Sequence, residues 1–136
     1  MTDARHALLA ACFVSSLGLA SCARRPGSDV VVITLDTVRA DHLGCYGHRG
    51  GLTPAIDRLA ARGVLFEDAS CTVPLTLPSH ASLFTGRYPT KTGVRNNGTF
   101  VLPEGETTLA FRLTALGYKT GAVIAAYPLQ SRFGLA

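Results

Sequence analysis

The stretch VVVITLDTVRADHLG, residues 30–44, decides the fold class. It opens with an almost wholly apolar run that is rich in β-branched residues, Val30–Leu35. Such a run is typical of a strand that is buried on both faces, as in a parallel sheet. Asp36 follows directly, at the carboxyl end of that strand, where open α/β sheets bind their ligands. The stretch therefore predicts an α/β fold with Asp36 at its ligand-binding edge, although an aspartate in this place can also simply cap the following turn.

Further along the chain, helix-like and strand-like segments alternate, which indicates a mainly parallel sheet flanked by helices. The clearest segment is a helix over residues 53–63, in which Thr53 suits the N-cap, Pro54 the first helical position and Gly63 the stop. Because about three strands make a poor domain by themselves, we expect residues 30–136 to be the N-terminal part of a larger domain. The other predicted elements are strands at residues 64–70 and 120–126 and helices at residues 78–84 and 107–117.

The N-terminus has the pattern of an export signal. The apolar run Ala7–Ala20 is too short to span a bilayer and ends in LASC, Leu19–Cys22. This ending resembles a bacterial lipobox, in which the signal is cut before the cysteine and the thiol is acylated. We therefore predict a lipoprotein signal peptide over residues 1–21, a linker over residues 22–29, and a lipid anchor on Cys22 that holds the protein at a membrane of the periplasm or cell envelope. Cleavage as an ordinary signal peptide is the alternative.

The composition of the chain argues against a nucleic-acid partner. Hydrophobic residues make up 47% of the 136 residues, enough for a core, and the net charge is +4 without a basic stripe. A mild positive charge can still attract anionic substrates. Cys45 and Cys71 could form a disulfide in an oxidising compartment, but two cysteines at this spacing leave the question open.

A second candidate site lies in CTVPLTLPSHASLFTGRYP, residues 71–89. Thr76 stands at the start of the helix that is predicted there, where the helix dipole and unpaired N–H groups favour anions. A hydroxyl is a weak nucleophile, so it needs a metal ion or a base to remove its proton. Asp36 could help to hold such an ion, and His80 lies one helical turn further on. The alternative is that Thr76 is only an N-cap residue.

Four segments of this chain together resemble the N-terminal part of a sulfatase, in the alkaline-phosphatase-like superfamily. They are VVVITLDTVRADHLGCYG, TPAIDRLAARGVLFEDASC, PLTLPSHASLFTGRYPTKTGV and LGYKTGAVI, in this order. The resemblance runs from about residue 29 to residue 136 and implies an alkaline-phosphatase-like α/β fold. It also implies a metal-dependent hydrolase of sulfate or phosphate esters, whose substrate is an anionic ester.

The resemblance assigns roles to particular residues. Asp36 falls on a metal-binding aspartate, and Thr76 falls on the nucleophile of the signature, which would also contact the metal. His80 is a second expected catalytic residue, and the expected ion is Ca²⁺, with Mg²⁺ or Zn²⁺ as alternatives. The expected substrate-binding residues are Ser79, Lys91 and Asn97. Because the remaining metal ligands of the family come from later segments, residues 1–136 alone are expected to be inactive.

Several positions depart from the family pattern. The nucleophile is normally a Cys or Ser that is converted to formylglycine, whereas Thr76 is not a substrate for that conversion. His80 stands in place of an Arg, Thr37 in place of a second metal-binding Asp, and Ala125 and Tyr127 where a catalytic Lys and His would be. These departures leave two alternatives: a phosphodiesterase or phosphotransferase that uses unmodified Thr76, and a non-catalytic binding lipoprotein that keeps the fold.

Overall fold

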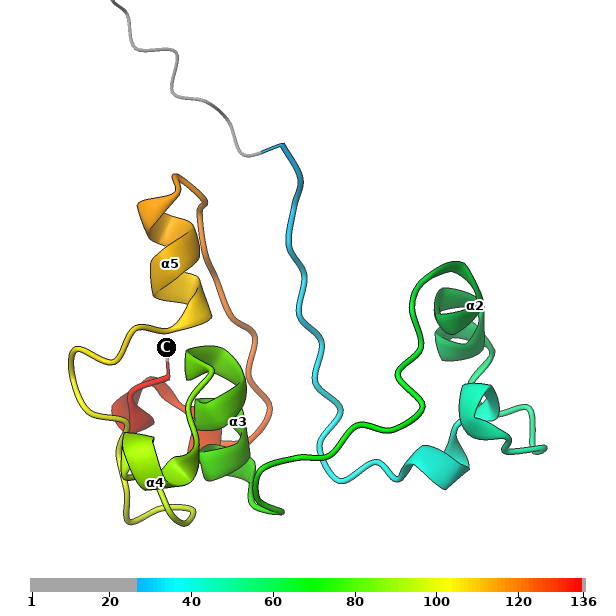
Figure 1. Ribbon diagram of the computed structural model, residues 1–136, viewed down its shortest axis with the longest axis horizontal. Helices are drawn as coiled ribbons and strands as arrows, with labels where there is room; N and C mark the ends of the chain where they lie inside the picture. The colour runs from blue at the N-terminus through cyan, green and yellow to red at the C-terminus, as the bar shows by residue number, and fades with distance from the viewer. Residues whose placement is uncertain (1–26, 136) are drawn as a thin grey trace, which may run out of the picture.

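The computed structural model describes residues 27–135, so the predicted signal peptide and Cys22 lie outside the described residues. Helices and helical turns form all the regular secondary structure in this range (Figure 1). The α-helices are α2 (Pro54–Arg62), α3 (Thr76–Thr85), α4 (Pro89–Thr92) and α5 (Leu109–Ala115). The 3₁₀ turns are η1 (Ala40–His42), η2 (Gly44–Tyr46), η3 (Tyr127–Leu129) and η4 (Ser131–Phe133).

The structure confirms the three predicted helices and adds a fourth. Helix α2 begins at Pro54 and ends at Arg62, just before Gly63, as the sequence predicts; Thr53 holds the N-cap position, but its side chain makes no capping hydrogen bond. Helix α5 is shorter than expected, and the side chain of Thr108 caps it by accepting a hydrogen bond from the Phe111 N–H. Helix α4 is a single turn that begins at Pro89, in a region where the sequence predicts only a loop.

The three predicted strands are not formed, so the structure does not confirm the mainly parallel sheet. Residues 30–35, 64–70 and 120–126 lie outside every helix of the range 27–135, and none of them belongs to a strand. Residues of segments 29–38 and 119–126 both line one open groove of about 810 Å³, and the two segments do not pair with each other. A strand exists only through ladder hydrogen bonds with a neighbour, whereas a helix satisfies its backbone groups internally. This difference explains why the helical predictions hold and the strand predictions do not.

The hydrophobic core lies around α3. Five buried side chains form it, contributed by α3, by residues 94–102 and by η4. Helix α3 also packs against α4, η3 and α5, and the Leu102 N–H donates to the Phe133 carbonyl at 3.0 Å. Gly86 ends α3 in the left-handed conformation at φ 69°, which glycine adopts without steric cost. The core side chains are Leu77, Ala81, Val94, Leu102 and Phe133.

Helix α2 and turn η2 form a second contact region, which is joined by polar groups. Asp57 on α2 accepts a hydrogen bond from the Cys45 N–H at 2.8 Å, and the Thr53 hydroxyl accepts one from the Gly44 N–H at 2.9 Å. The Tyr46 hydroxyl donates to the Phe66 carbonyl at 2.8 Å. None of the residues in η1, η2 or α2 is buried. Hydrogen bonds rather than an apolar core therefore hold this region together.

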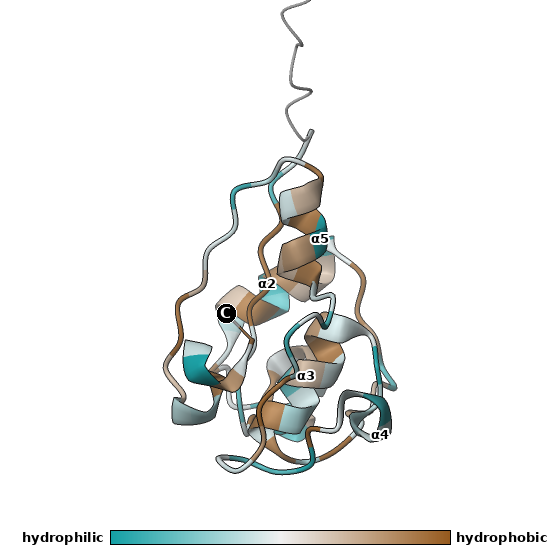
Figure 2. Cartoon of the chain, turned by 90° about the vertical axis from the view of Figure 1, so that its left-hand side faces the viewer, coloured by the Kyte–Doolittle hydropathy of each residue, from teal (hydrophilic) through white to brown (hydrophobic). Residues whose placement is uncertain are grey.

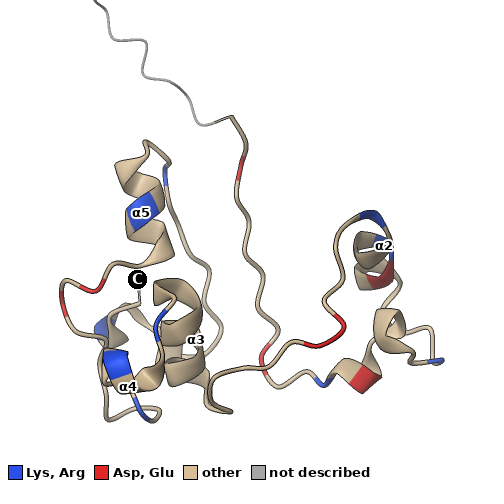
Figure 3. Ribbon diagram, in the orientation of Figure 1, with Lys and Arg blue, Asp and Glu red and all other residues tan. Residues whose placement is uncertain are grey.

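Within residues 27–135, the basic residues are spread out and the two cysteines are unpaired. The lysine and arginine positions of this range lie on several separate elements (Figure 3). Cys45 and Cys71 are both free thiols, so the disulfide that the sequence left open is not formed in this structure. Across residues 27–135, no helix has the length and apolar character needed to cross a membrane. Figure 2 shows the apolar character of much of α3 and α5 and of the extended segments beside them.

Candidate active site

The candidate site is built at the first turn of α3. Leu75 is the N-cap in an extended conformation, and Thr76 is the first helical residue. Leu75 offers no side-chain cap, and the cap comes instead from a distant loop, where the Asn97 Oδ1 accepts a hydrogen bond from the Leu77 N–H at 2.8 Å. This contact satisfies one of the N–H groups that a helix start leaves without an intrahelical partner. Asn97 therefore fixes the start of α3 and keeps its loop close to Thr76.

Asp36 and Thr76 meet directly. The Thr76 hydroxyl donates a hydrogen bond to the Asp36 Oδ2 at 2.9 Å, although the two residues are 40 positions apart in the chain. Asp36 is exposed and Thr76 is half-buried, so the contact lies at the surface beside α3. The structure thus brings together the two residues that the sequence singles out as the metal ligand and the attacking group.

The backbone turns sharply right after Asp36. Thr37 has a φ of 60°, and it is the one non-glycine residue of the described range with a positive φ. A β-branched residue in this left-handed region is a steric outlier that costs about 1–3 kcal/mol. Such strained residues concentrate at functional sites, where surrounding contacts hold them. The turn at Thr37 directs the chain away from α3 and leaves the Asp36 carboxylate facing Thr76.

His80 lies one helical turn beyond Thr76 and is engaged at both ring nitrogens. Its Nδ1 is 2.8 Å from the Thr76 carbonyl oxygen, and its Nε2 is 3.1 Å from the Thr34 Oγ1. His80 is only 8% exposed. The Thr34 side chain was not singled out from the sequence. A usable signal exists, because residues two apart in an extended segment point to the same side and Thr34 precedes Asp36 by two.

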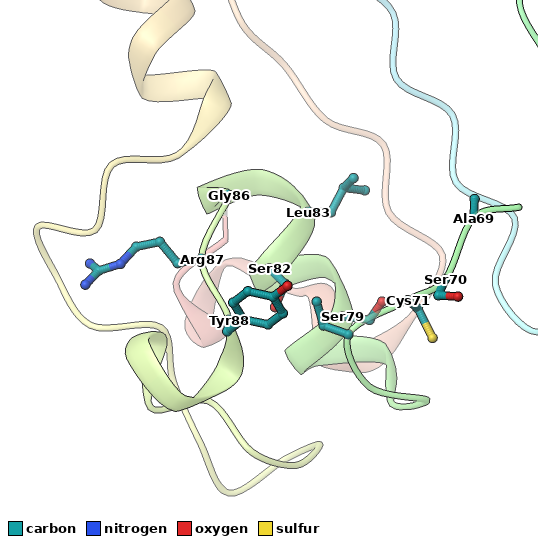
Figure 4. Close-up of a pocket in the computed structure, with 10 residues that line it drawn as sticks. Ala69, Ser70, Cys71, Ser79, Ser82, Leu83, Gly86, Arg87 and Tyr88 are labelled. Atoms are coloured by element: carbon teal, nitrogen blue, oxygen red, sulfur yellow. The ribbon is translucent and has the colours of Figure 1, made fainter. Parts of the chain in front are cut away.

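Helix α3 separates two hollows, and the predicted site residues are divided between them. Asp36 and His80 line the groove of about 810 Å³, together with Thr34. Ser79 lines a separate pocket of about 550 Å³ on another side of the helix, next to residues 69–72 (Figure 4). Neighbouring helical residues point in different directions, and here Ser79 faces the pocket while His80 faces the groove. Ser79 and Asp36 thus do not share one hollow.

The backbone donors of the first turn of α3 are mostly engaged. The Leu77 N–H donates to Asn97, the Ser79 N–H donates to the Leu75 carbonyl at 3.0 Å, and Pro78 has no N–H. The start of this helix, where the sequence predicts unpaired N–H groups that favour anions, therefore has few free backbone donors. Lys91, another expected substrate-binding residue, is exposed on α4.

The described residues do not form a complete set of metal ligands. They contain no group of three or more His, Cys, Asp and Glu side chains that could hold an ion. The carboxylate of Asp36 and the hydroxyl of Thr76 are nevertheless two oxygen donors at one place. Asp41, the next carboxylate along the chain, pairs instead with the Arg39 guanidinium at 2.6 Å, and hydrogen bonding from Arg39 lowers the pKa of Asp41 below its ordinary value.

Comparison with known proteins identifies the family. The profile of the Sulfatase family matches residues 28–131. This chain belongs to the sulfatase family. The steryl-sulfatase of Rattus norvegicus is 40% identical to this chain over 114 residues, which cover 75% of this chain and 20% of that protein. Arylsulfatase A of Homo sapiens is 44% identical over 99 residues, which cover 68% of this chain and 19% of that protein. The matched part thus spans about a fifth of the length of these relatives.

Proposed function

We propose that this sulfatase-family chain carries the nucleophile, Thr76, and one metal ligand, Asp36, of a metal-dependent hydrolase of sulfate or phosphate esters. The 2.9 Å hydrogen bond between the Thr76 hydroxyl and the Asp36 carboxylate carries the proposal. The relatives named above as steryl-sulfatase and arylsulfatase A support an ester of sulfuric acid as the first substrate class to test.

The oxygen atoms of this contact suit a hard divalent cation. A carboxylate and a hydroxyl are ligands that Ca²⁺ and Mg²⁺ prefer, whereas Zn²⁺ more often takes nitrogen or sulfur as well. Calcium takes about six to eight oxygen ligands, so Asp36 and Thr76 would need further ligands beside them. A bound divalent ion would favour loss of the proton from a hydroxyl that it contacts.

The residues of this chain would prepare the attack. Asp36 accepts the hydrogen bond from the Thr76 hydroxyl and so orients the lone pairs of the Thr76 oxygen. The Thr76 oxygen would attack sulfur or phosphorus in line as its hydroxyl proton is lost to water, and the bond to the leaving ester oxygen would break as that oxygen takes up a proton from water. A second water would then cleave the enzyme ester, which releases sulfate or phosphate and restores the Thr76 hydroxyl. The Asn97 amide nitrogen and Lys91 are the proposed donors to the ester oxygens.

The direct test uses the full-length protein with added Ca²⁺, Mg²⁺ or Zn²⁺. Aryl sulfates and phosphate mono- and diesters are the substrates. Thr76→Ala should lower the rate of ester hydrolysis at least about 10³-fold, since the nucleophile itself is lost. Asp36→Asn should weaken binding of the added ion, which calorimetry measures without an activity assay. Thr90→Ala, at an exposed position on α4, is the matched control and should keep the wild-type rate. Full activity of Thr76→Ala would end the proposal.

A second candidate is a phosphodiesterase or phosphotransferase that uses unmodified Thr76. The residue type itself favours it, because the side chain at position 76 is a secondary alcohol and not the Cys or Ser of the sulfatase signature. Intact mass spectrometry of the purified protein would show whether residue 76 is modified. An unmodified threonine together with a preference for phosphodiesters over sulfate esters would select this second candidate.

We also propose that the protein is exported and held at the membrane by acyl chains on Cys22. The lipobox-like LASC, residues 19–22, supports this proposal. Labelling with a radioactive fatty acid should mark the wild-type protein and not the Cys22→Ser variant. Equal labelling of both would contradict the lipid anchor.

A further inference from the structure

A closed series of contacts joins the extended segment before Asp36 to the first turn of α3. The Thr76 hydroxyl donates to Asp36, the Thr76 carbonyl contacts the His80 Nδ1, and the His80 Nε2 contacts the Thr34 hydroxyl. Thr34 and Asp36 lie two residues apart on the same extended segment. His80 and Asp36 therefore hold that segment at two points, one turn apart along α3.

The hydrogen-bond partners fix the tautomer of His80. A carbonyl oxygen only accepts, so the contact of 2.8 Å with Thr76 requires a proton on Nδ1. In the neutral ring, Nε2 then accepts a hydrogen bond from the Thr34 hydroxyl, 3.1 Å away. The ring is also set against the Phe84 ring, with the centroids 6.3 Å apart. Both nitrogens of this buried ring are engaged, and neither is bonded to the Thr76 hydroxyl.

We propose that His80 is a positioning residue, and not the base that takes the proton of Thr76. It fixes Thr34 against α3, and Thr34 in turn fixes the distance between the Asp36 carboxylate and the Thr76 hydroxyl. This inference rests on the proposed function of Thr76 as the attacking group. It assigns Thr34, a residue outside the predicted site, a specific part in building the site.

The kinetic test separates positioning from proton transfer. Thr34→Val keeps the shape of the side chain but removes the hydroxyl, and it should lower kcat about tenfold with KM unchanged. Thr34→Ser restores the hydroxyl and should recover kcat to within about twofold. Thr90→Val is the control for a threonine that lies outside the contact series. Equal kcat in the wild type, Thr34→Val and Thr34→Ser would overturn the proposal.

A spectroscopic test does not depend on activity. Long-range ¹H–¹⁵N NMR of the full-length protein reports which ring nitrogen of His80 carries the proton, and the His80→Asn variant assigns the resonance. We expect Nδ1 to be protonated in the wild type and the Nε2 resonance to shift in Thr34→Val. A ring protonated on Nε2 alone would overturn the proposal whatever the activity. An Nδ1-protonated ring together with a fully active Thr76→Ala variant would instead refute the nucleophile assignment and leave the contact series intact.

Discussion

Two apolar regions of this chain have opposite burial. In the core around α3, Leu77 and Val94 are 0% exposed. In the segment before Asp36, Val31 and Ile33 are 78% and 76% exposed, although this run is at least as apolar in sequence. The core side chains come from α3, from residues 94–102 and from η4, many of whose backbone groups are paired within helical turns or with each other. The comparison shows that apolar sequence alone does not produce burial, because a strand-like segment must first find partners for its backbone.

The largest expected effect on stability is at the core. Leu77→Ala removes a fully buried side chain and should lower the free energy of unfolding by about 2–5 kcal/mol, since it leaves a cavity. Leu83→Ala is the control on the same helix, because Leu83 is mostly exposed, and it should cost about 0.5 kcal/mol or less. Urea denaturation of both variants measures the difference. Equal losses would mean that the core assignment is wrong.

The start of α3 offers the next largest effect. Asn97→Ala removes the cap on the Leu77 N–H and should cost about 1 kcal/mol of stability. The neighbouring Asn96 accepts its hydrogen bond from Thr99 within an exposed loop, so Asn96→Ala should cost less than about half of this. Thermal unfolding followed by circular dichroism compares the pair. A larger loss in Asn96→Ala would contradict the role of Asn97 in joining its loop to α3.

A smaller effect on stability is expected in the exposed segment before Asp36. Ile33→Ser should change the free energy of unfolding of residues 27–135 by no more than about 0.5 kcal/mol, because the Ile33 side chain is mostly in contact with solvent. The same substitution in the full-length protein measures whether another part of the protein covers Ile33. If Ile33→Ser in residues 27–135 lowered the free energy of unfolding as much as Leu77→Ala does, the side chain of Ile33 would have to be buried in solution, contrary to the structure.

The smallest expected effect concerns the exposed pair of Arg39 and Asp41. The hydrogen bond from Arg39 lowers the pKa of Asp41, so the pair stabilises the fold above the ordinary pKa of an aspartate. That contribution is lost as the pH falls through the lowered pKa. Arg39→Gln should return the pKa of Asp41 toward its ordinary value, measured by NMR titration of the carboxyl carbon. Arg49→Gln is the control, and an unchanged Asp41 titration in Arg39→Gln would contradict the pairing.

The helices could be predicted from the sequence because their signals are local. Thr53 and Pro54 mark the start of α2 and Gly63 marks its end, and the helix in the structure runs between them. The strands could not be predicted with the same success, since their formation depends on segments that come together from distant positions. The pattern of apolar residues shows that a segment favours an extended conformation. The segment becomes a strand only when a neighbouring segment forms backbone hydrogen bonds with it.

Part of the candidate site was also predictable. The sequence places Asp36 and Thr76 at the ends of separate elements, and the structure joins them by a hydrogen bond. Their catalytic roles stay predictions. The contact between Thr34 and His80 was missed because it depends on how the extended segment lies beside α3. The cap supplied by Asn97 was missed for the same reason, because no residue next to Thr76 in sequence indicates a partner from the loop after α4.

The left-handed backbone at Thr37 makes the position of the Asp36 carboxylate depend on contacts with the rest of the protein. Because threonine disfavours this conformation, the bend does not persist through the preference of its own residue, and outside contacts must maintain it. The bond from Thr76 to Asp36 is the nearest such contact. The Thr76→Ala variant lacks this hydrogen bond, so Thr37 could relax to a negative φ and the Asp36 carboxylate would move away from α3. A glycine at position 37 adopts a positive φ without strain, so the Thr37→Gly variant would keep the bend even without the hydrogen bond from Thr76.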